Sequence, residues 1–132
     1  MLNSKVNTRL LKVLCPTMKF EVGAVSSIPV GNFNLTETYD MARDAIDIAQ
    51  TDWDSFEISW NFLKSPMIKA DIRDATVEKS FYNWESHSED QITLMQGLEI
   101  ENNRIFMEAY NIRDEFDSFV SKEQITLARA DR

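Results

Sequence analysis

An apolar repeat with alternating steps of three and four residues constrains this 132-residue chain more than any other feature. The repeat runs through residues 39–63 and again through residues 77–109. Such spacing is that of a heptad seam, in which one face of a long helix packs against another helix. We therefore expect a mainly α fold, in which two long helices form an antiparallel hairpin behind a short N-terminal segment of one helix and one strand.

The first long helix is expected to begin at Asn34, because Asn34 followed by Glu37 is a capping-box pattern. Pro66 should end it, since proline cannot continue a helix. A second capping pattern at residues 51–54 lies in the middle of the run. One continuous helix and a helix that breaks near residue 50 and restarts are both consistent with this sequence.

The second long helix is expected from about Thr76 to Tyr110. Gly97 lies inside it and costs about 1 kcal/mol relative to alanine, so local bending is expected there. Asn111 suits the left-handed residue that commonly follows a helix, with Ile112 packing back on it. A turn of helix over residues 113–119 is expected to follow.

The two ends of the chain carry shorter patterns. Residues 2–14 have apolar side chains on one helical face, and Pro16 should stop that helix. Alternating apolar residues between 20 and 30 predict a short strand with a bulge or turn. A short extended stretch is expected at residues 124–128. We divide the chain at residue 30, with the helical hairpin and its extended tail in residues 31–132.

The predicted helices carry more aromatic side chains than one seam can hide. Some should therefore face the N-terminal segment, a second copy of the chain or further sequence. These candidates for the core or for an interface are Trp53, Phe56, Trp60, Phe81, Trp84 and Phe106.

Charge is distributed unevenly along the chain. Residues 1–30 hold four basic residues and one acidic residue, a net charge of +3, which leaves −11 for residues 31–132 and −8 overall. The overall charge excludes a wholly basic nucleic-acid binder. The basic segment is either a local contact for DNA phosphates or a solvated face. The candidate phosphate contacts are Lys5, Arg9, Lys12 and Lys19.

Motifs for catalysis and for metal binding are missing from the sequence. Its glycines and prolines are isolated, so neither a glycine-rich loop for a methyl donor nor a prolyl-prolyl loop for a flipped base is present. One histidine, His87, and one cysteine, Cys15, cannot build a Cys/His zinc site. We therefore expect no catalytic residue, no metal and no cofactor here. A lone thiol and the lack of a long apolar run fit a cytoplasmic protein with no membrane contact.

The order of several segments resembles one protein family. Residues 52–62, DWDSFEISWNF, are similar to the segment DWDSFETSWDF of PglX-like adenine-specific DNA methyltransferases of BREX phage defence, which are often described as type IIS restriction–modification enzymes. Residues 103–115 resemble that family's NRIFIxxYGLQDEL, and residues 125–132 resemble its VTVRKADR. Residues 2–30 resemble the end of a target-recognition region, with its helix followed by a short strand.

The resemblance implies a C-terminal fragment of a much longer enzyme, lying after the methyl-transfer domain. Its expected role is that of a non-catalytic spacer beside the target-recognition region, with DNA and the rest of the parent chain as partners. S-adenosylmethionine is implied for the parent and not for this fragment. The alternative is a self-contained helical module for protein–protein interaction or dimerisation.

Overall fold

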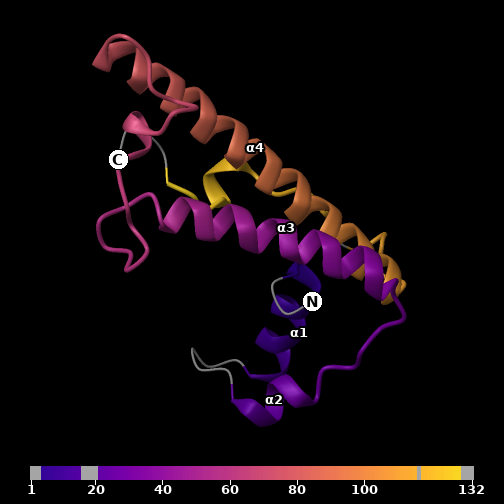
Figure 1. The fold of residues 1–132 in the computed structure, drawn as a ribbon. Helices are drawn as coiled ribbons and strands as arrows, with labels where there is room; N and C mark the ends of the chain where they lie inside the picture. The colour runs from indigo at the N-terminus through magenta and orange to yellow at the C-terminus, as the bar shows by residue number, and fades with distance from the viewer. Residues whose placement is uncertain (1–3, 16–20, 116, 129–132) are drawn as a thin grey trace.

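The structure is a computed structural model, and it describes residues 4–15, 21–115 and 117–128. Within these ranges it is mainly helical and contains no strand. The elements are α1 (Lys5–Leu14), α2 (Val22–Ser26), α3 (Leu35–Trp53), the short 3-10 helix η1 (Pro66–Ile68), α4 (Val77–Ala109) and a second 3-10 helix, η2 (Lys122–Gln124). Figure 1 shows α3 and α4 crossing each other, with α1 and α2 projecting from them.

The long helix α4 organises the fold and is delimited by local signals. The side chain of Thr76 accepts a hydrogen bond from the backbone N–H of Lys79 at 3.2 Å and begins the helix. At the other end Asn111 is left-handed, with a φ of 56°. The N–H of Ile112 donates to the carbonyl of Met107 at 3.0 Å, which closes a Schellman motif. The predicted helix is confirmed to within a residue at each end, and it continues through its one glycine.

Helix α3 begins as expected and ends earlier than expected. The Asn34 side chain accepts from the N–H groups of Thr36 and Glu37, at 3.1 and 3.4 Å. The prediction that this helix extends to Pro66 is wrong, because it ends at Trp53 without restarting. The Ser59 hydroxyl donates to the Asp54 carboxylate across the turns that follow. Such side-chain bonds compete with a continuing helix where no neighbour packs on it.

The face of α3 that packs on α4 is not the predicted seam. Ile48 is buried, Ala45 packs beside it, and both lie on the side facing α4. In the predicted seam, Tyr39 is 67% exposed and Ile46 is 62% exposed. Each packed residue precedes a seam residue by one position, and one residue is a rotation of about 100° on a helix. The repeat is present, but it faces solvent.

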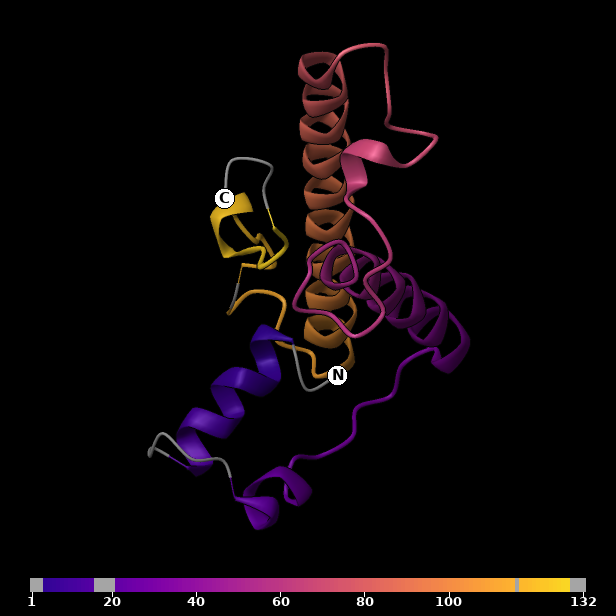
Figure 2. The same ribbon diagram turned by 60° about the vertical axis from the view of Figure 1, so that its left-hand side comes forward.

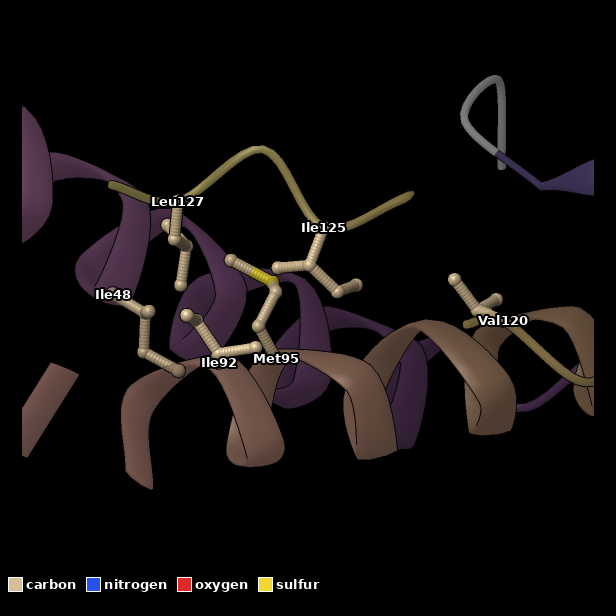
Figure 3. Close-up of a cluster of buried hydrophobic side chains, with 6 residues drawn as sticks. All are labelled: Ile48, Ile92, Met95, Val120, Ile125 and Leu127. Atoms are coloured by element: carbon tan, nitrogen blue, oxygen red, sulfur yellow. The ribbon is translucent and has the colours of Figure 1, made fainter. Parts of the chain in front are cut away.

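A core of three layers lies where α3 and α4 cross. Residues 120–127 form the third layer, which Figure 2 shows beside α4. This layer also packs on α3, because its side chains share a cluster with Ile48. The core residues shown in Figure 3 are Ile48, Ile92, Met95, Val120, Ile125 and Leu127. The Gln96 side chain donates to the carbonyl of Val120 at 2.7 Å and fixes the third layer to α4.

The N-terminal segment packs on the far end of α4 in a second cluster. Val6 of α1 is buried with Phe106 and Met107, and Phe33 meets Phe106 edge to face with ring centroids 4.9 Å apart. Gly31 also lies against α4. The helix expected over residues 2–14 is confirmed as α1 from Lys5 to Leu14, with Ser4 as its N-cap. Its first two predicted residues lie outside the described ones.

The strand expected between residues 20 and 30 is wrong. Residues 22–26 form the short helix α2, and Phe20 lies outside the described residues. Both Ser26 and Ser27 donate their hydroxyl protons to the carbonyl of Gly23, at 3.0 and 2.8 Å. A strand needs a ladder partner, and the described residues contain none, so the local hydrogen bonds of a helical turn prevail.

The C-terminal predictions also need correction. Residues 113–115 form a turn and not a helix, and residue 116 lies outside the described residues. The expected extended stretch begins with the last residue of η2 and continues irregularly from Ile125, which is extended. Among the described residues, no helix is both long and apolar enough to cross a membrane.

Candidate functional site

Helix α1 is held firmly on α4, which fixes the direction of its side chains. Ser4 caps it by accepting from the N–H of Asn7 at 3.3 Å, and both residues are buried. Asn103 of α4 links it to the rest of the fold, because its Oδ1 accepts from the N–H of Lys5 at 2.8 Å. The Nδ2 of Asn103 donates to the carbonyl of Ser118 at 3.2 Å. One buried amide therefore joins three segments that are far apart in the sequence.

Three of the four predicted phosphate contacts lie together on α1, near the hydrogen bonds of Asn103. The residues lining a shallow cleft of about 480 Å³ between α1 and the C-terminal segment are Lys5, Thr8, Arg9, Lys12, Glu115, Asp117 and Gln124. Lys5, Arg9 and Lys12 are spaced at i, i+4 and i+7, which places them on one helical face. Lys19 lies outside the described residues.

The three basic side chains differ in their surroundings. The Lys5 ammonium donates to the carbonyl of Phe119 and lies 3.5 Å from the carbonyl oxygen of Asp117. It is therefore directed toward the C-terminal segment. Arg9 and Lys12 are exposed. The carboxylates of Glu115 and Asp117 line the same cleft, so they reduce its positive charge to a small excess. Sequence reasoning missed these two acids, because over 100 residues separate them from α1.

The predicted aromatic set is divided between buried and exposed positions. Phe106 is fully buried, whereas Trp53 is 55% exposed and Trp60 is completely exposed. Phe56, Phe81 and Trp84 are half-buried. The rings of Phe81 and Trp84 meet edge to face with centroids 6.2 Å apart. These six residues therefore do not form one surface.

A second cleft of about 160 Å³ lies near the end of α3. Phe56, Trp84 and His87 are among the residues lining it. Asp52 also lines it, and its carboxylate accepts from the N–H of Ala128 at 3.1 Å through each oxygen. Partial burial raises the pKa of Asp52, and the bond from Ala128 partly offsets that rise. This cleft was not predictable from the sequence, since it depends on a contact between residues 76 positions apart in the chain.

The described residues do not fit a methyl-donor site. Such a site needs glycines clustered in a loop so that the backbone can approach the ligand. Here Gly23 lies in α2, Gly31 packs against Ala109, and Gly97 lies inside α4. The parts of the chain that the structure describes also hold no group of three or more His, Cys, Asp or Glu side chains placed to bind a metal ion.

Comparison with known proteins identifies relatives along almost the whole chain. No family model matches it. In an alignment 132 positions long that covers 98% of this chain, it is 30% identical to the adenine-specific methyltransferase PglX of Lacticaseibacillus casei (strain Zhang). Over 91 residues, 69% of this chain, it is 34% identical to the adenine-specific methyltransferase BrxX of Escherichia coli O9:H4 (strain HS). The match spans only 11% of the first relative and 7% of the second. The resemblance noted in the sequence is thereby confirmed.

Proposed function

From the relationship of this chain to a segment of adenine-specific methyltransferases, we propose that it is a non-catalytic spacer within a site-specific adenine DNA methyltransferase of phage defence. The observation that carries the proposal is a match along 98% of the chain that covers only 11% of the relative. Another part of the longer polypeptide then performs methyl transfer, with S-adenosylmethionine as the donor. The chain's role is to hold DNA recognition at a fixed distance from that part.

The long helices supply the rigidity that a spacer needs. Helix α4 has 33 residues, which corresponds to about 50 Å at 1.5 Å per residue. Helix α1 is packed on its C-terminal end, and the loop of residues 54–76 is at its other end (Figure 1). We propose that α3 and α4 act together as an antiparallel hairpin between these two places. A flipped adenine must reach the catalytic pocket while other residues contact the site, so the separation must be kept constant.

Arg9 and Lys12 are the proposed phosphate contacts on the recognition side. They are exposed on the face of α1 that borders the cleft, and the packing of Val6 and Leu11 holds that helix in place. Lys5 contributes less, because its ammonium donates to the carbonyl of Phe119. Phosphate contacts of this kind position a protein on the duplex and carry no sequence information. The net charge of −8 predicts that the isolated chain binds DNA weakly.

The test is a salt titration of duplex binding by a full-length methyltransferase that carries this segment. The double variant Arg9→Ala/Lys12→Ala should lower affinity equally for cognate and unrelated duplexes. The slope of log K against log salt should fall by about 1.8, since each phosphate contact contributes about 0.9.

A matched control is Lys64→Ala/Arg73→Ala, which removes the same charge from exposed positions in the loop between α3 and α4. The control should leave the salt slope unchanged. If the Arg9/Lys12 variant keeps the full slope, or if both variants lower it equally, these residues do not contact phosphate.

A further inference from the structure

We propose that the cleft near the end of α3 binds a planar organic cation that carries an amidinium or guanidinium group. This inference goes beyond the spacer function and does not rest on it. The cleft has a volume of about 160 Å³. Four segments line it, namely the last turns of α3, the loop that follows, the first half of α4 and the C-terminal segment. Its lining combines apolar, aromatic and charged side chains, as sites for small ligands do.

The size of the cleft and its apolar walls fit one flat ring. An apolar cavity of about 150 Å³ holds a single benzene molecule, so this cleft admits a ring with a small substituent. Ile48 and Leu127, two of the core residues in Figure 3, are part of its lining. Phe56 and Trp84 add aromatic rings, and the edge-to-face contact with Phe81 holds the Trp84 ring in place. Aromatic rings attract cations as well as apolar groups, because their faces are electron-rich.

The charged side chains of the cleft favour a cation. Asp52 and Asp71 line it together with Lys69, so two carboxylates are present with one ammonium. Lys69 also lines the neighbouring cleft, which Asp47 and Asp54 line as well. The ammonium therefore lies among further carboxylates and does not neutralise the two acids of the first cleft.

Asp52 is the carboxylate best placed to hold the cation. The N–H of Ala128 fixes its position at 3.1 Å from each oxygen, and each oxygen can accept a second hydrogen bond. Within the described parts of the chain Asp52 forms no ion pair. A carboxylate that has lost water and gained no opposite charge is stabilised when a cation enters beside it. The forked N–H groups of an amidinium or guanidinium match its two oxygens, whereas an ammonium is a point charge.

An anion or a metal ion fits the cleft less well. Among the described residues lining it, Lys69 is the one lysine or arginine, and a bound anion would lie beside two carboxylates. The described parts of the chain also hold no group of three or more acidic, histidine or cysteine side chains placed to bind a metal ion. A flat cation uses both the aromatic walls and the carboxylates.

The test is a titration of the isotope-labelled 132-residue chain, followed by NMR, with three ligands of nearly the same shape. Benzamidine carries the cation, benzamide is its neutral counterpart, and benzoate carries the opposite charge. Benzamidine should bind with a Kd on the order of 1 mM, and the other two at least about ten-fold more weakly. Added salt should weaken the binding of benzamidine, because the attraction is electrostatic. Equal binding of benzamidine and benzamide, tighter binding of benzoate, or no binding of benzamidine would overturn the proposal.

The indole N–H signals of two tryptophans locate the bound cation. Trp84 lines the cleft, whereas Trp60 is completely exposed and lies outside the lining. Benzamidine should shift the Trp84 signal and leave the Trp60 signal unchanged. If the Trp84 signal does not move, or if both signals move equally, the ligand binds elsewhere and the proposal is wrong.

Two variants test the charges of the cleft with opposite expected signs. Asp52→Asn keeps an oxygen for the Ala128 N–H, and it should weaken benzamidine binding about ten-fold without affecting benzamide. Lys69→Gln removes the opposing charge and should tighten benzamidine binding by about two- to five-fold. The matched control Asp40→Asn removes the same charge as Asp52→Asn from an exposed position of α3, about 18 Å along the helix, and should change nothing. If the two aspartate variants weaken binding equally, Asp52 does not hold the cation and the proposal is wrong.

A capped arginine distinguishes the two sources of such a group. N-acetyl-arginine amide carries the guanidinium on a flexible chain, as a peptide does, and has no ring. If it shifts the Trp84 signal at least as readily as benzamidine, an arginine side chain of a partner protein supplies the cation. If benzamidine alone binds, the ligand is a small molecule with a ring. Both results support the planar cation, and failure of both ligands to bind would contradict it.

Discussion

Helices α3 and α4 were both predicted to pack through a repeat of three and four residues, yet they differ in how many side chains they bury. Six side chains of α4 are buried, whereas Ile48 is the one buried side chain of α3. In both helices the buried face is displaced from the predicted repeat, since only Met95 of these seven residues belongs to it. Helix α4 is contacted by α1, α3, η1 and η2, and the main contact of α3 is with α4. The comparison shows that the number of neighbouring elements, and not the repeat, decides how many side chains of a helix are buried and on which face.

Two isoleucines of α3 test the difference between its buried and exposed faces. Ile48 is 8% exposed in the core and Ile46 is 62% exposed in the predicted seam. Ile48→Ala should lower the free energy of unfolding by about 2–4 kcal/mol, through lost burial and a residual cavity. Ile46→Ala should change it by less than about 0.5 kcal/mol, since alanine favours helix and little burial is lost. Urea denaturation followed by tryptophan fluorescence measures both.

Because the two variants make the same chemical change in one helix, each is the control of the other. Equal losses would mean that the predicted seam is packed within the isolated chain, and α3 and α4 would then not differ in the way described. Larger loss for Ile46→Ala would mean that the predicted seam is the true core face of α3.

Local signals in the sequence predicted the starts of both long helices and the end of α4. Asn34 and Thr76 accept hydrogen bonds from the N–H groups that follow them, and Asn111 adopts the left-handed conformation. Each of these features depends on a few neighbouring residues, so the sequence contains all the information needed. The early end of α3 at Trp53 lies at the second capping pattern of residues 51–54, where a break was one of the two expected outcomes. That the helix does not restart was not predictable in this way, because it depends on which other segments pack there.

Two further features could not be predicted for the same reason: which face of α3 is buried, and which residues surround the candidate DNA-contacting side chains. The sequence identified an apolar repeat, but Ile48 is buried by residues 120–127, which join α3 and α4 from the C-terminal end of the chain. Likewise, the spacing of Lys5, Arg9 and Lys12 placed them on one face, whereas Glu115 and Asp117 across the cleft could not be foreseen. Contacts between distant segments are tertiary, and periodicity carries no information about them.

At the C-terminal end of α4, the buried side chain of Asn103 joins α1 to the C-terminal segment. Asn103 is 3% exposed, accepts from the N–H of Lys5 and donates to the carbonyl of Ser118. Asn103→Ala should cost about 1–3 kcal/mol, because it leaves the partly buried Lys5 N–H and Ser118 carbonyl without their partner. Chemical denaturation measures the loss, and hydrogen exchange should show faster exchange in α1.

The matched control is Asn102→Ala, one position earlier in α4 at a half-buried site. That variant should cost well under 1 kcal/mol. Equal losses of unfolding free energy at the two positions would mean that the hydrogen bond from Lys5 to Asn103 contributes no stability of its own. The losses would then reflect helix propensity alone.

A third prediction concerns how α4 ends. Asn111 has a φ of 56°, which costs most L-residues roughly 1–2 kcal/mol. Asn111→Ala should therefore destabilise the protein by about 1 kcal/mol, and Asn111→Gly should not destabilise it. Thermal unfolding of both variants measures the difference. If alanine and glycine behave alike, the left-handed residue does not delimit α4.

The last and smallest effect concerns how α3 ends. Its final turn is tied to the C-terminal segment by Asp52, whose pKa burial raises above the ordinary value of 3.8, with the bond from the Ala128 N–H as the lesser, opposing influence. A raised pKa means that the folded state holds the proton more tightly than the unfolded state does. This contribution is therefore most favourable below pH 3.8 and is lost as the pH rises through the raised value. Asp52→Asn keeps an oxygen for the Ala128 N–H and removes the buried charge. It should match or exceed the original stability at neutral pH, by about 0.5 kcal/mol or less because solvent screens a half-exposed group, and the gain should vanish in acid.

Glu101 of α4 supplies the opposite case, since its bond to Arg104 lowers the pKa of its carboxyl. Glu101→Gln should lose stability at neutral pH and not in acid. Thermal unfolding at about pH 7 and about pH 3 compares the two variants. If both respond to pH in the same direction, burial at the end of α3 does not control Asp52.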